Sequence, residues 1–136
     1  MKISINSTPF LGAKNVFILD GGGHGCSMEH FARAIFKNTD ANVKFQRVNV
    51  NENLYDVKDN PNYEFVQGDI CDKDVVFDVV SGVDAIVNFA AETHVDRSIT
   101  GPEIFIETNV KGTLTLLQAA KQFNIERFVQ ISTDEV

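Results

Sequence analysis

The chain has 136 residues, 43% of them hydrophobic, which is enough for one core and too little for a second sizeable domain. Its 12 Lys and Arg against 19 Asp and Glu give a net charge of −7, which argues against a nucleic-acid partner, because phosphate backbones attract clustered positive charge. No apolar run approaches the roughly 20 residues of a membrane span, and residues 1–14 lack the order of a signal peptide. We therefore expect a soluble, cytoplasmic protein with no membrane partner, two reduced cysteines and no metal site.

Five short apolar runs alternate with helical patterns along the chain. Such runs, separated by enough chain for a helical crossover, are typical of parallel strands buried on both faces. The predicted strands are Asn15–Leu19, Val43–Val48, Tyr63–Val66, Ala85–Phe89 and Arg127–Ile131, and the predicted helices are Met28–Lys37, Lys73–Ser81 and Pro102–Asn124. This order predicts an α/β fold, a Rossmann-like doubly wound parallel sheet of about five strands over residues 15–136, after an N-terminal extension of residues 1–14.

The third predicted helix shows the clearest pattern. Pro102 suits a first helical position. Four large apolar residues at helical spacing predict one buried stripe: Ile106, Val110, Leu114 and Leu117. Gly112 lowers helix propensity, so it indicates either the close approach of another backbone or ligand, or a simply tolerated glycine.

A glycine-rich segment, Asp20–Gly25, lies between the first predicted strand and the first predicted helix. Glycines there allow positive φ and let backbone N–H groups approach a phosphate at a helix N-terminus. The third glycine of a dinucleotide motif is expected near position 28, where this chain has Met28. The segment is therefore either a dinucleotide phosphate loop or an ordinary strand-to-helix turn.

The end of the second predicted strand lacks the acidic residue that usually binds the ribose hydroxyls. The residues there are Gln46, Arg47 and Asn49. Arg47 could meet a 2′-phosphate and favour NADP, or it could be a solvated strand-end side chain.

Two further strand ends carry candidate binding residues. Asp69 could accept a hydrogen bond from an adenine amino group, or it could be the N-cap of the following helix. Ala90 and Ala91 leave space for a flat ligand, or they are small residues chosen for packing.

A hydroxyl and two carboxylates, Thr133, Asp134 and Glu135, follow the last predicted strand. A pair of carboxylates at that place is typical of acid–base chemistry. Successive strand residues point to opposite faces, so Thr133 and Glu135 share a side and Asp134 does not, unless the chain turns. Because no residue follows Val136 to hold such a turn, we expect a frayed, solvated end.

Several segments together carry a more specific pattern: NFAAETHVDRSI at 88–99, GP at 101–102, FIETN at 105–109, GT at 112–113 and ISTDEV at 131–136. They closely resemble the dTDP-glucose 4,6-dehydratases of the extended short-chain dehydrogenase/reductase superfamily. The segment EFVQGDICD at 64–72 is similar to the third strand and adenine-contacting turn of that family. The resemblance is strongest from Tyr63 onward and weak over residues 17–62.

The resemblance implies NAD as a recycled cofactor and a dTDP-glucose-like nucleotide sugar as substrate of a lyase. In the family, NAD oxidises carbon 4, water leaves across carbons 5 and 6, and the hydride returns to carbon 6. The implied substrate contacts are His94 and Thr133, with Asp134 as general acid and Glu135 as the base at carbon 5. The implied cofactor contacts are Gly22, Gly25, Cys26, Ser27, Asp69, Ile70, Ala90, Ala91, Glu92, Thr93 and Thr108.

Two features of the family are missing from this sequence. Its Tyr-x-x-x-Lys pair and substrate-binding domain are expected after Val136, and the residues four positions after Tyr55 and Tyr63 are Asp59 and Gln67. The resemblance thus implies the N-terminal cofactor-binding portion of a dehydratase. We expect the chain as given to be catalytically incompetent and to bind NAD weakly or not at all.

Two other functions remain open. The chain could be a degenerate, non-catalytic member whose helix 102–124 forms a homo-oligomer interface, since in this superfamily the helices after strands four and five commonly pair subunits. It could also be half of a nucleotide-sugar epimerase or reductase, although segments 92–97 and 133–135 favour the dehydratase.

Overall fold

A computed structural model describes residues 13–20, 33–37, 41–47, 59–93 and 95–132. Its centre is a five-stranded parallel sheet with the order β3-β2-β1-β4-β5. The predicted doubly wound fold is therefore confirmed, and each predicted strand boundary lies within one residue of the observed one. The strands are β1 (Asn15–Asp20), β2 (Asn42–Arg47), β3 (Tyr63–Gln67), β4 (Ala85–Phe89) and β5 (Arg127–Gln130).

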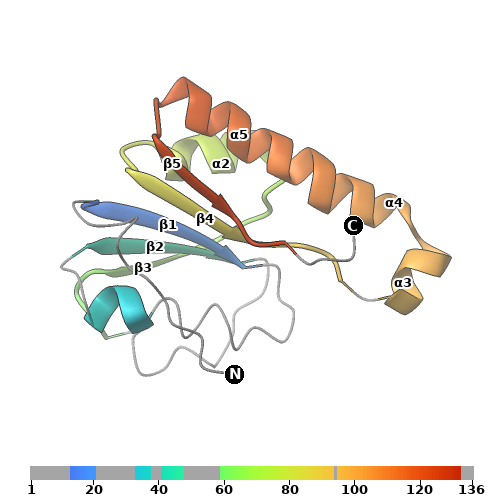
Figure 1. Ribbon diagram of the computed structural model, residues 1–136, viewed down its shortest axis with the longest axis horizontal. Helices are drawn as coiled ribbons and strands as arrows, with labels where there is room; N and C mark the ends of the chain where they lie inside the picture. Colours follow the sequence, from blue (N-terminus) through green and yellow to red (C-terminus); the bar gives the residue numbers. More distant parts are fainter. Residues whose placement is uncertain (1–12, 21–32, 38–40, 48–58, 94, 133–136) are drawn as a thin grey trace.

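Helices cover both faces of this sheet. Figure 1 shows α2 and α5 on one face and the helical residues 33–37 on the other. The remaining part of the predicted helix 28–37 lies outside the described residues. The helices are α2 (Lys73–Val80), α3 (Val95–Thr100), α4 (Glu103–Phe105), the π-helix η3 (Ile106–Gly112) and α5 (Thr113–Gln122). The last three run on as one long helix, and α3 is an element that the sequence did not predict.

The core has two halves, one on each face of the sheet. Alternate residues of β1 point to opposite faces, so Val16 and Ile18 enter one half while Phe17 and Leu19 enter the other, and all four are fully buried. The half under α2 and α5 includes Val76, Leu116 and Ala119. A strand buried on both faces matches the near-continuous apolar run from which β1 was predicted.

The long helix buries a different face from the predicted one. Its inward residues are Gly112, Thr115, Leu116, Ala119 and Ala120. The four residues of the predicted buried stripe are instead exposed, at 64, 58, 52 and 46%: Ile106, Val110, Leu114 and Leu117. That prediction was wrong because small side chains, which let the helix backbone approach the sheet, form the packed face.

The amino edge of the sheet is fastened by Asp84. Its carboxylate accepts hydrogen bonds from the backbone N–H groups of Lys14 and Asn15, both at 2.9 Å. The start of β1 is thereby tied to the start of β4. A hollow of about 450 Å³ lies at the same edge, lined by residues 82–84 and 123–127, and holds none of the predicted site residues.

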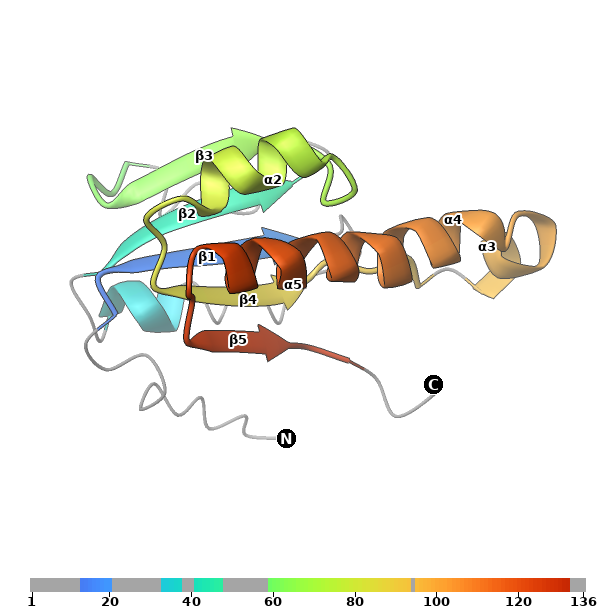
Figure 2. The same ribbon diagram turned by 90° about the horizontal axis from the view of Figure 1, so that it is seen from above.

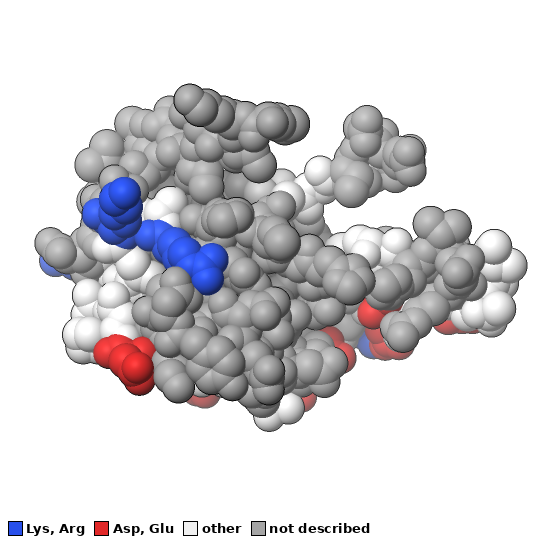
Figure 3. Space-filling model, turned by 90° about the horizontal axis from the view of Figure 1, so that it is seen from below, with Lys and Arg blue, Asp and Glu red and all other residues white. Residues whose placement is uncertain are grey.

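The surface carries charges of both signs. On the face seen in Figure 3, the described Lys and Arg side chains form a small group with Asp and Glu side chains nearby. Within the described ranges, no helix is long and apolar enough to cross a membrane.

Candidate active-site edge

The carboxyl ends of the parallel strands form the candidate site. The sheet order reverses between β1 and β4, whose last residues Asp20 and Phe89 are register partners. In doubly wound sheets, ligands bind in the crevice outside the carboxyl ends at such a switch point. Figure 2 shows the long helix crossing above the sheet and extending past these ends, toward α3.

A buried amide shapes the exit of β4. The side chain of Asn88 is fully buried, donates from Nδ2 to Gln130 Oε1 at 2.9 Å and accepts from the N–H of Ala90 at 3.0 Å. Both hydrogen bonds satisfy a polar group that would otherwise be costly to bury. Asn88 thus fixes the direction in which the chain leaves the sheet.

The segment after β4 holds four predicted cofactor contacts. Ala90 is buried, Ala91 and Glu92 are half-buried, and Thr93 is exposed. The predicted residues therefore become more accessible with distance from the strand.

The turn after β3 holds the other described pair, Asp69 and Ile70. Asp69 is exposed, and its Oδ1 accepts a hydrogen bond from the N–H of Cys71 at 2.8 Å. It is not the cap of α2, because Asp72 accepts from the N–H groups of Asp74 and Val75. The capping alternative for Asp69 was therefore wrong.

The side chain of Ile70 enters the core, at 5% exposure, beneath the long helix. A Cβ added to Gly112 would lie 2.5 Å from both Cγ1 and Cδ1 of Ile70, much closer than carbon atoms approach without a shift. The neighbour of Gly112 is thus the Ile70 side chain, and not the backbone or ligand that the sequence suggested as one of its two explanations.

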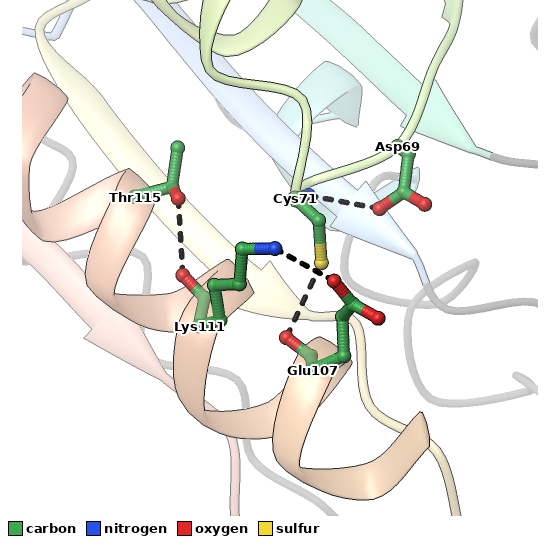
Figure 4. A network of polar contacts seen from close by, with 5 residues as sticks. All are labelled: Asp69, Cys71, Glu107, Lys111 and Thr115. Atoms are coloured by element: carbon green, nitrogen blue, oxygen red, sulfur yellow. Dashed lines mark hydrogen bonds and ion pairs between the residues drawn. The ribbon is translucent and has the colours of Figure 1, made fainter. Parts of the chain in front are cut away.

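A small polar network joins this turn to the long helix (Figure 4). The Cys71 thiol donates to the backbone oxygen of Glu107 at 3.2 Å. Lys111 lies 2.6 Å from Glu107 Oε1, and Thr115 Oγ1 donates to the Lys111 backbone oxygen at 3.0 Å. Burial, and next the Asp69 carboxylate, raise the pKa of Cys71 to about 11, while Glu107 raises the pKa of Lys111. Cys71 is therefore a protonated donor and a poor nucleophile.

Asn109 is a contact that the sequence analysis missed. Its Oδ1 accepts from the Glu92 N–H at 2.8 Å, and its Nδ2 donates to the Glu92 backbone oxygen at 3.1 Å. The sequence does contain a weak signal for this contact: Asn has a low propensity for a helix interior, so its presence there suggests a specific side-chain hydrogen bond. Thr108, the predicted cofactor contact beside it, is half-buried in η3.

Several predicted site residues lie outside the described residues: Gly22, Gly25, Cys26, Ser27, His94, Thr133, Asp134 and Glu135. Met28 lies outside them too, as does the side chain of Arg47. Among the residues that the structure does describe, no three His, Cys, Asp or Glu side chains are placed to hold a metal ion.

The sheet order, the switch point and the crossover helices define a doubly wound α/β protein of the Rossmann type. Residues 26–136 match the family described as GDP-mannose 4,6 dehydratase. The chain belongs to this family.

Its relatives confirm the predicted resemblance. The chain is 49% identical over 123 residues to the low-salt glycan biosynthesis protein Agl12 of Haloferax volcanii, covering 88% of this chain and 40% of the relative. It is 48% identical over 128 residues to the dTDP-glucose 4,6-dehydratase of Streptomyces niveus, and this match covers 88% of this chain and 38% of that relative. The crystal structure of the dTDP-glucose 4,6-dehydratase DesIV from Streptomyces venezuelae, with NAD and TYD bound, superposes with a TM-score of 0.81 at 41% identity, over 90% of this chain and 40% of that one. This chain thus spans about 40% of the length of the relatives it matches.

Proposed function

We propose that this chain forms the NAD-binding part of a nucleotide-sugar 4,6-dehydratase, a lyase whose substrate is dTDP-glucose or a close analogue. The observation that carries the proposal is the carboxyl edge, where the Ala90–Thr93 segment leaves the switch point and the Asp69–Ile70 turn follows β3. The relatives named dTDP-glucose 4,6-dehydratase, at 48 and 41% identity, support the same activity.

The residues at this edge fit NAD. One oxygen of the exposed Asp69 carboxylate accepts the Cys71 N–H, and a carboxylate has capacity for further donors such as an adenine amino group. Ala90 and Ala91 are small enough to leave room for a flat ring beside β4. Asp69, the Ala90–Thr93 segment and Thr108 would hold the cofactor, which when bound supplies reversible hydride acceptance.

The acid–base work would belong to the residues after β5. Asp134 would protonate the departing hydroxyl, Glu135 would remove the proton from carbon 5, and Thr133 and His94 would bind the sugar nucleotide. Such a division needs an environment that separates the pKa values of the two carboxyl groups, which burial against a substrate would provide.

We further propose that the chain by itself binds NAD weakly. Met28 stands where a third glycine lets a helix start pack closely. Replacing Met28→Gly should tighten NAD binding by roughly tenfold. Micromolar affinity of the unaltered chain in calorimetry would contradict weak binding.

The proposed site is tested by nuclear magnetic resonance titration, which detects millimolar affinities. Adding NAD should shift the amide signals of residues 69–70 and 90–93, and Asp69→Ala should abolish or greatly reduce these shifts. Asp78→Asn is the matched control, because it removes the same charge from an exposed position on α2. Shifts confined to other parts of the chain would contradict the proposal, and a parallel NADP titration tests the role of Arg47.

A second proposed role is the pairing of two copies through the outer face of the long helix. Four large apolar residues are exposed along it, and contiguous apolar surface of this kind marks interfaces: Ile106, Val110, Leu114 and Leu117. A two-fold contact would bring the same stripe of both copies together. Sedimentation should show dimers that dissociate on Leu114→Glu but not on Gln122→Glu, which adds the same charge elsewhere on the helix. Monomers alone at high concentration would contradict this role.

We also propose a cytoplasmic location and a role in nucleotide-sugar metabolism. The named function of the relative at 48% identity supports the metabolic role. Cell fractionation with an antibody against the chain tests the location.

A further inference from the structure

The backbone ladder between β4 and β5 ends at a definite pair of residues. Asn88 and Gln130 are the last register partners, and the Ile131 N–H donates to the Asn88 backbone oxygen at 3.0 Å. In a parallel ladder of this register, the next hydrogen bond would join the Ala90 N–H to the Ile131 oxygen. The Ala90 N–H donates instead to Asn88 Oδ1, at 3.0 Å. The Ile131 oxygen accepts instead from Gln130 Nε2, at 3.1 Å.

Two side-chain amides take the place of that missing ladder bond. Asn88 Nδ2 donates to Gln130 Oε1 at 2.9 Å, so the amides connect the Ala90 N–H to the Ile131 oxygen through a row of hydrogen bonds. The backbone N–H at one end can only donate and the backbone oxygen at the other can only accept, which leaves each amide one orientation. All donors then point the same way along the row, an arrangement in which hydrogen bonds strengthen one another.

The position of Asn88 would suit an apolar side chain if stability were its only role. Its side chain is fully buried, and its neighbours on the same face of the strand, Ile86 and Ala90, belong to the apolar core half under α2 and α5. Burying an amide requires that its polar atoms be paired, whereas an aliphatic side chain carries no such requirement. The buried amide therefore indicates a role in the geometry of the strand ends.

The substitution of two amides for one ladder bond changes the distance between the chains. Strands joined by a ladder lie about 4.8 Å apart. A sugar ring between two walls needs about 7 Å, because its atoms approach each wall to about 3.5 Å. In the proposed reaction, segment 90–93 borders the cofactor and residues 133–135 act on the same sugar, so the ring must fit between the two exits. Figure 2 shows the chain moving away from β4 after the end of β5.

We propose that Asn88 and Gln130 form a spacer that keeps the exits of β4 and β5 apart, so that the hexose ring of a nucleotide sugar fits between them. Both are positioning residues, because they act through the backbone at Ala90 and Ile131. The identity of the occupant rests on the proposed function, whereas the spacer itself rests on the hydrogen bonds.

The direct test is the measurement of hydrogen-bond scalar couplings by nuclear magnetic resonance in the whole chain. Coupling is expected from the Ala90 nitrogen to Asn88 Cγ and from Asn88 Nδ2 to Gln130 Cδ, with none from the Ala90 nitrogen to the Ile131 carbonyl carbon. In the double variant Asn88→Ala and Gln130→Ala, the ladder should close and this last coupling should appear. Gln122→Ala, which truncates an exposed glutamine on α5, is the matched control and should keep the unaltered pattern.

Two single variants test the row of hydrogen bonds without emptying the buried position. Gln130→Glu keeps an acceptor for Asn88 Nδ2, and Gln130→Met has a similar length but removes both bonds of the amide. Exchange of the Ala90 N–H should rise by about tenfold in Gln130→Met, the worth of one net hydrogen bond, and should change little in Gln130→Glu. Equal exchange rates in these two variants would show that Gln130 does not hold Asn88.

The occupant is tested by titrating dTDP-glucose, at millimolar concentration and with NAD present. It should shift the amide signals of residues 90–93 and 131–132, whereas dTDP, which lacks the sugar, should leave them unchanged. In the double variant the affinity for dTDP-glucose should fall by about tenfold. The shifts that NAD causes at residues 69–70 should remain, because that turn is not part of the spacer.

The outcomes separate the spacer from the proposed function. A direct coupling from Ala90 to Ile131 in the unaltered chain, or its absence from the folded double variant, overturns the spacer. Couplings as expected with dTDP-glucose shifts that are equal in the unaltered chain and the double variant, or absent from both, overturn the sugar as occupant. If NAD itself shifts neither 69–70 nor 90–93, the proposed function fails, and the couplings alone then support or overturn the spacer.

Discussion

The two faces of the long helix are built from opposite kinds of apolar residue. The inward face has Gly112, Thr115, Ala119 and Ala120, with Leu116 as its one large side chain. The outward face has four branched aliphatic side chains, all at least 46% exposed: Ile106, Val110, Leu114 and Leu117. Hydrophobicity alone would bury the second face, and the fold buries the first.

This difference shows that closeness of approach, and not the amount of apolar surface, decides which face packs on the sheet. Small residues let the helix backbone come near the strands and the turn after β3. Even the one polar residue of that face is satisfied within the helix, because Thr115 donates to the Lys111 backbone oxygen. The large side chains remain exposed on the outward face.

The largest expected effect comes from truncating two neighbouring leucines, one on each face of the long helix. Leu116 is fully buried and Leu117 is 46% exposed. Leu116→Ala should lower the free energy of unfolding by about 2–5 kcal/mol, and Leu117→Ala by less than about 1 kcal/mol. Urea denaturation at low protein concentration measures both. Equal losses for the two variants would mean that both faces are packed.

A second, smaller effect tests why the inward face is built from small residues. Gly112→Ala should gain about 1 kcal/mol of helix propensity and lose about 1–3 kcal/mol through contact of the new Cβ with Ile70, for a net loss of about 1 kcal/mol.

The double variant with Ile70→Ala decides the cause. In that background the contact is absent, so Gly112→Ala should be neutral or stabilising, which gives a coupling energy of about 2 kcal/mol between the two positions. Strictly additive effects would show that Gly112 is small for another reason.

The smallest effect concerns Cys71, where the inward face meets the turn after β3. Its pKa is raised to about 11, mainly by burial, so the native state favours the protonated thiol. Its contribution to stability is therefore complete below the ordinary thiol pKa of about 8.5 and is lost as the pH rises through about 11.

This prediction is measured in a Cys26→Ser background, which leaves one thiol. The thiolate absorbance of the native protein should titrate with a midpoint near 11, and that of the urea-unfolded protein near about 8.5. Asp69→Asn should lower the native midpoint, because it removes a neighbouring negative charge. A native midpoint close to the unfolded one would show that the thiol is not held against the helix.

The sequence was sufficient to predict the sheet, because strands buried on both faces are continuous apolar runs in the sequence. The runs around Phe17, Val43 and Ile86 predicted β1, β2 and β4 to within one residue. The long helix was also located, but its orientation was not, because periodicity identifies a stripe without saying whether the sheet or a partner covers it. The short helix α3 was missed, since six residues are too few to establish a period.

The site was predicted less completely, for a similar physical reason. Asp69, Ala90 and Ala91 were predicted as contacts because they follow strands; the strand ends were correct, and the contacts with a cofactor stay predictions. Asn88 and Asn109 were not assigned, because their roles depend on backbone groups that only the folded chain brings within reach. The same holds for Gly112, whose crowding by Ile70 joins two distant parts of the sequence.

The order of the strands in the sheet also means that β1 must wait for its neighbour β4 while the chain is being synthesised. The central strand β1 is the first to be made, but its neighbour β4 comes much later, and the groups that fasten the two starts, Asn15 and Asp84, are 69 residues apart. At a translation rate of about 5–20 residues per second, β1 waits roughly 3 to 14 seconds for that partner. Throughout that interval one hydrogen-bonding edge of β1 is unpaired, and such an edge is a template for association with other chains. Slow translation between β1 and β4 should therefore lower the yield of soluble protein.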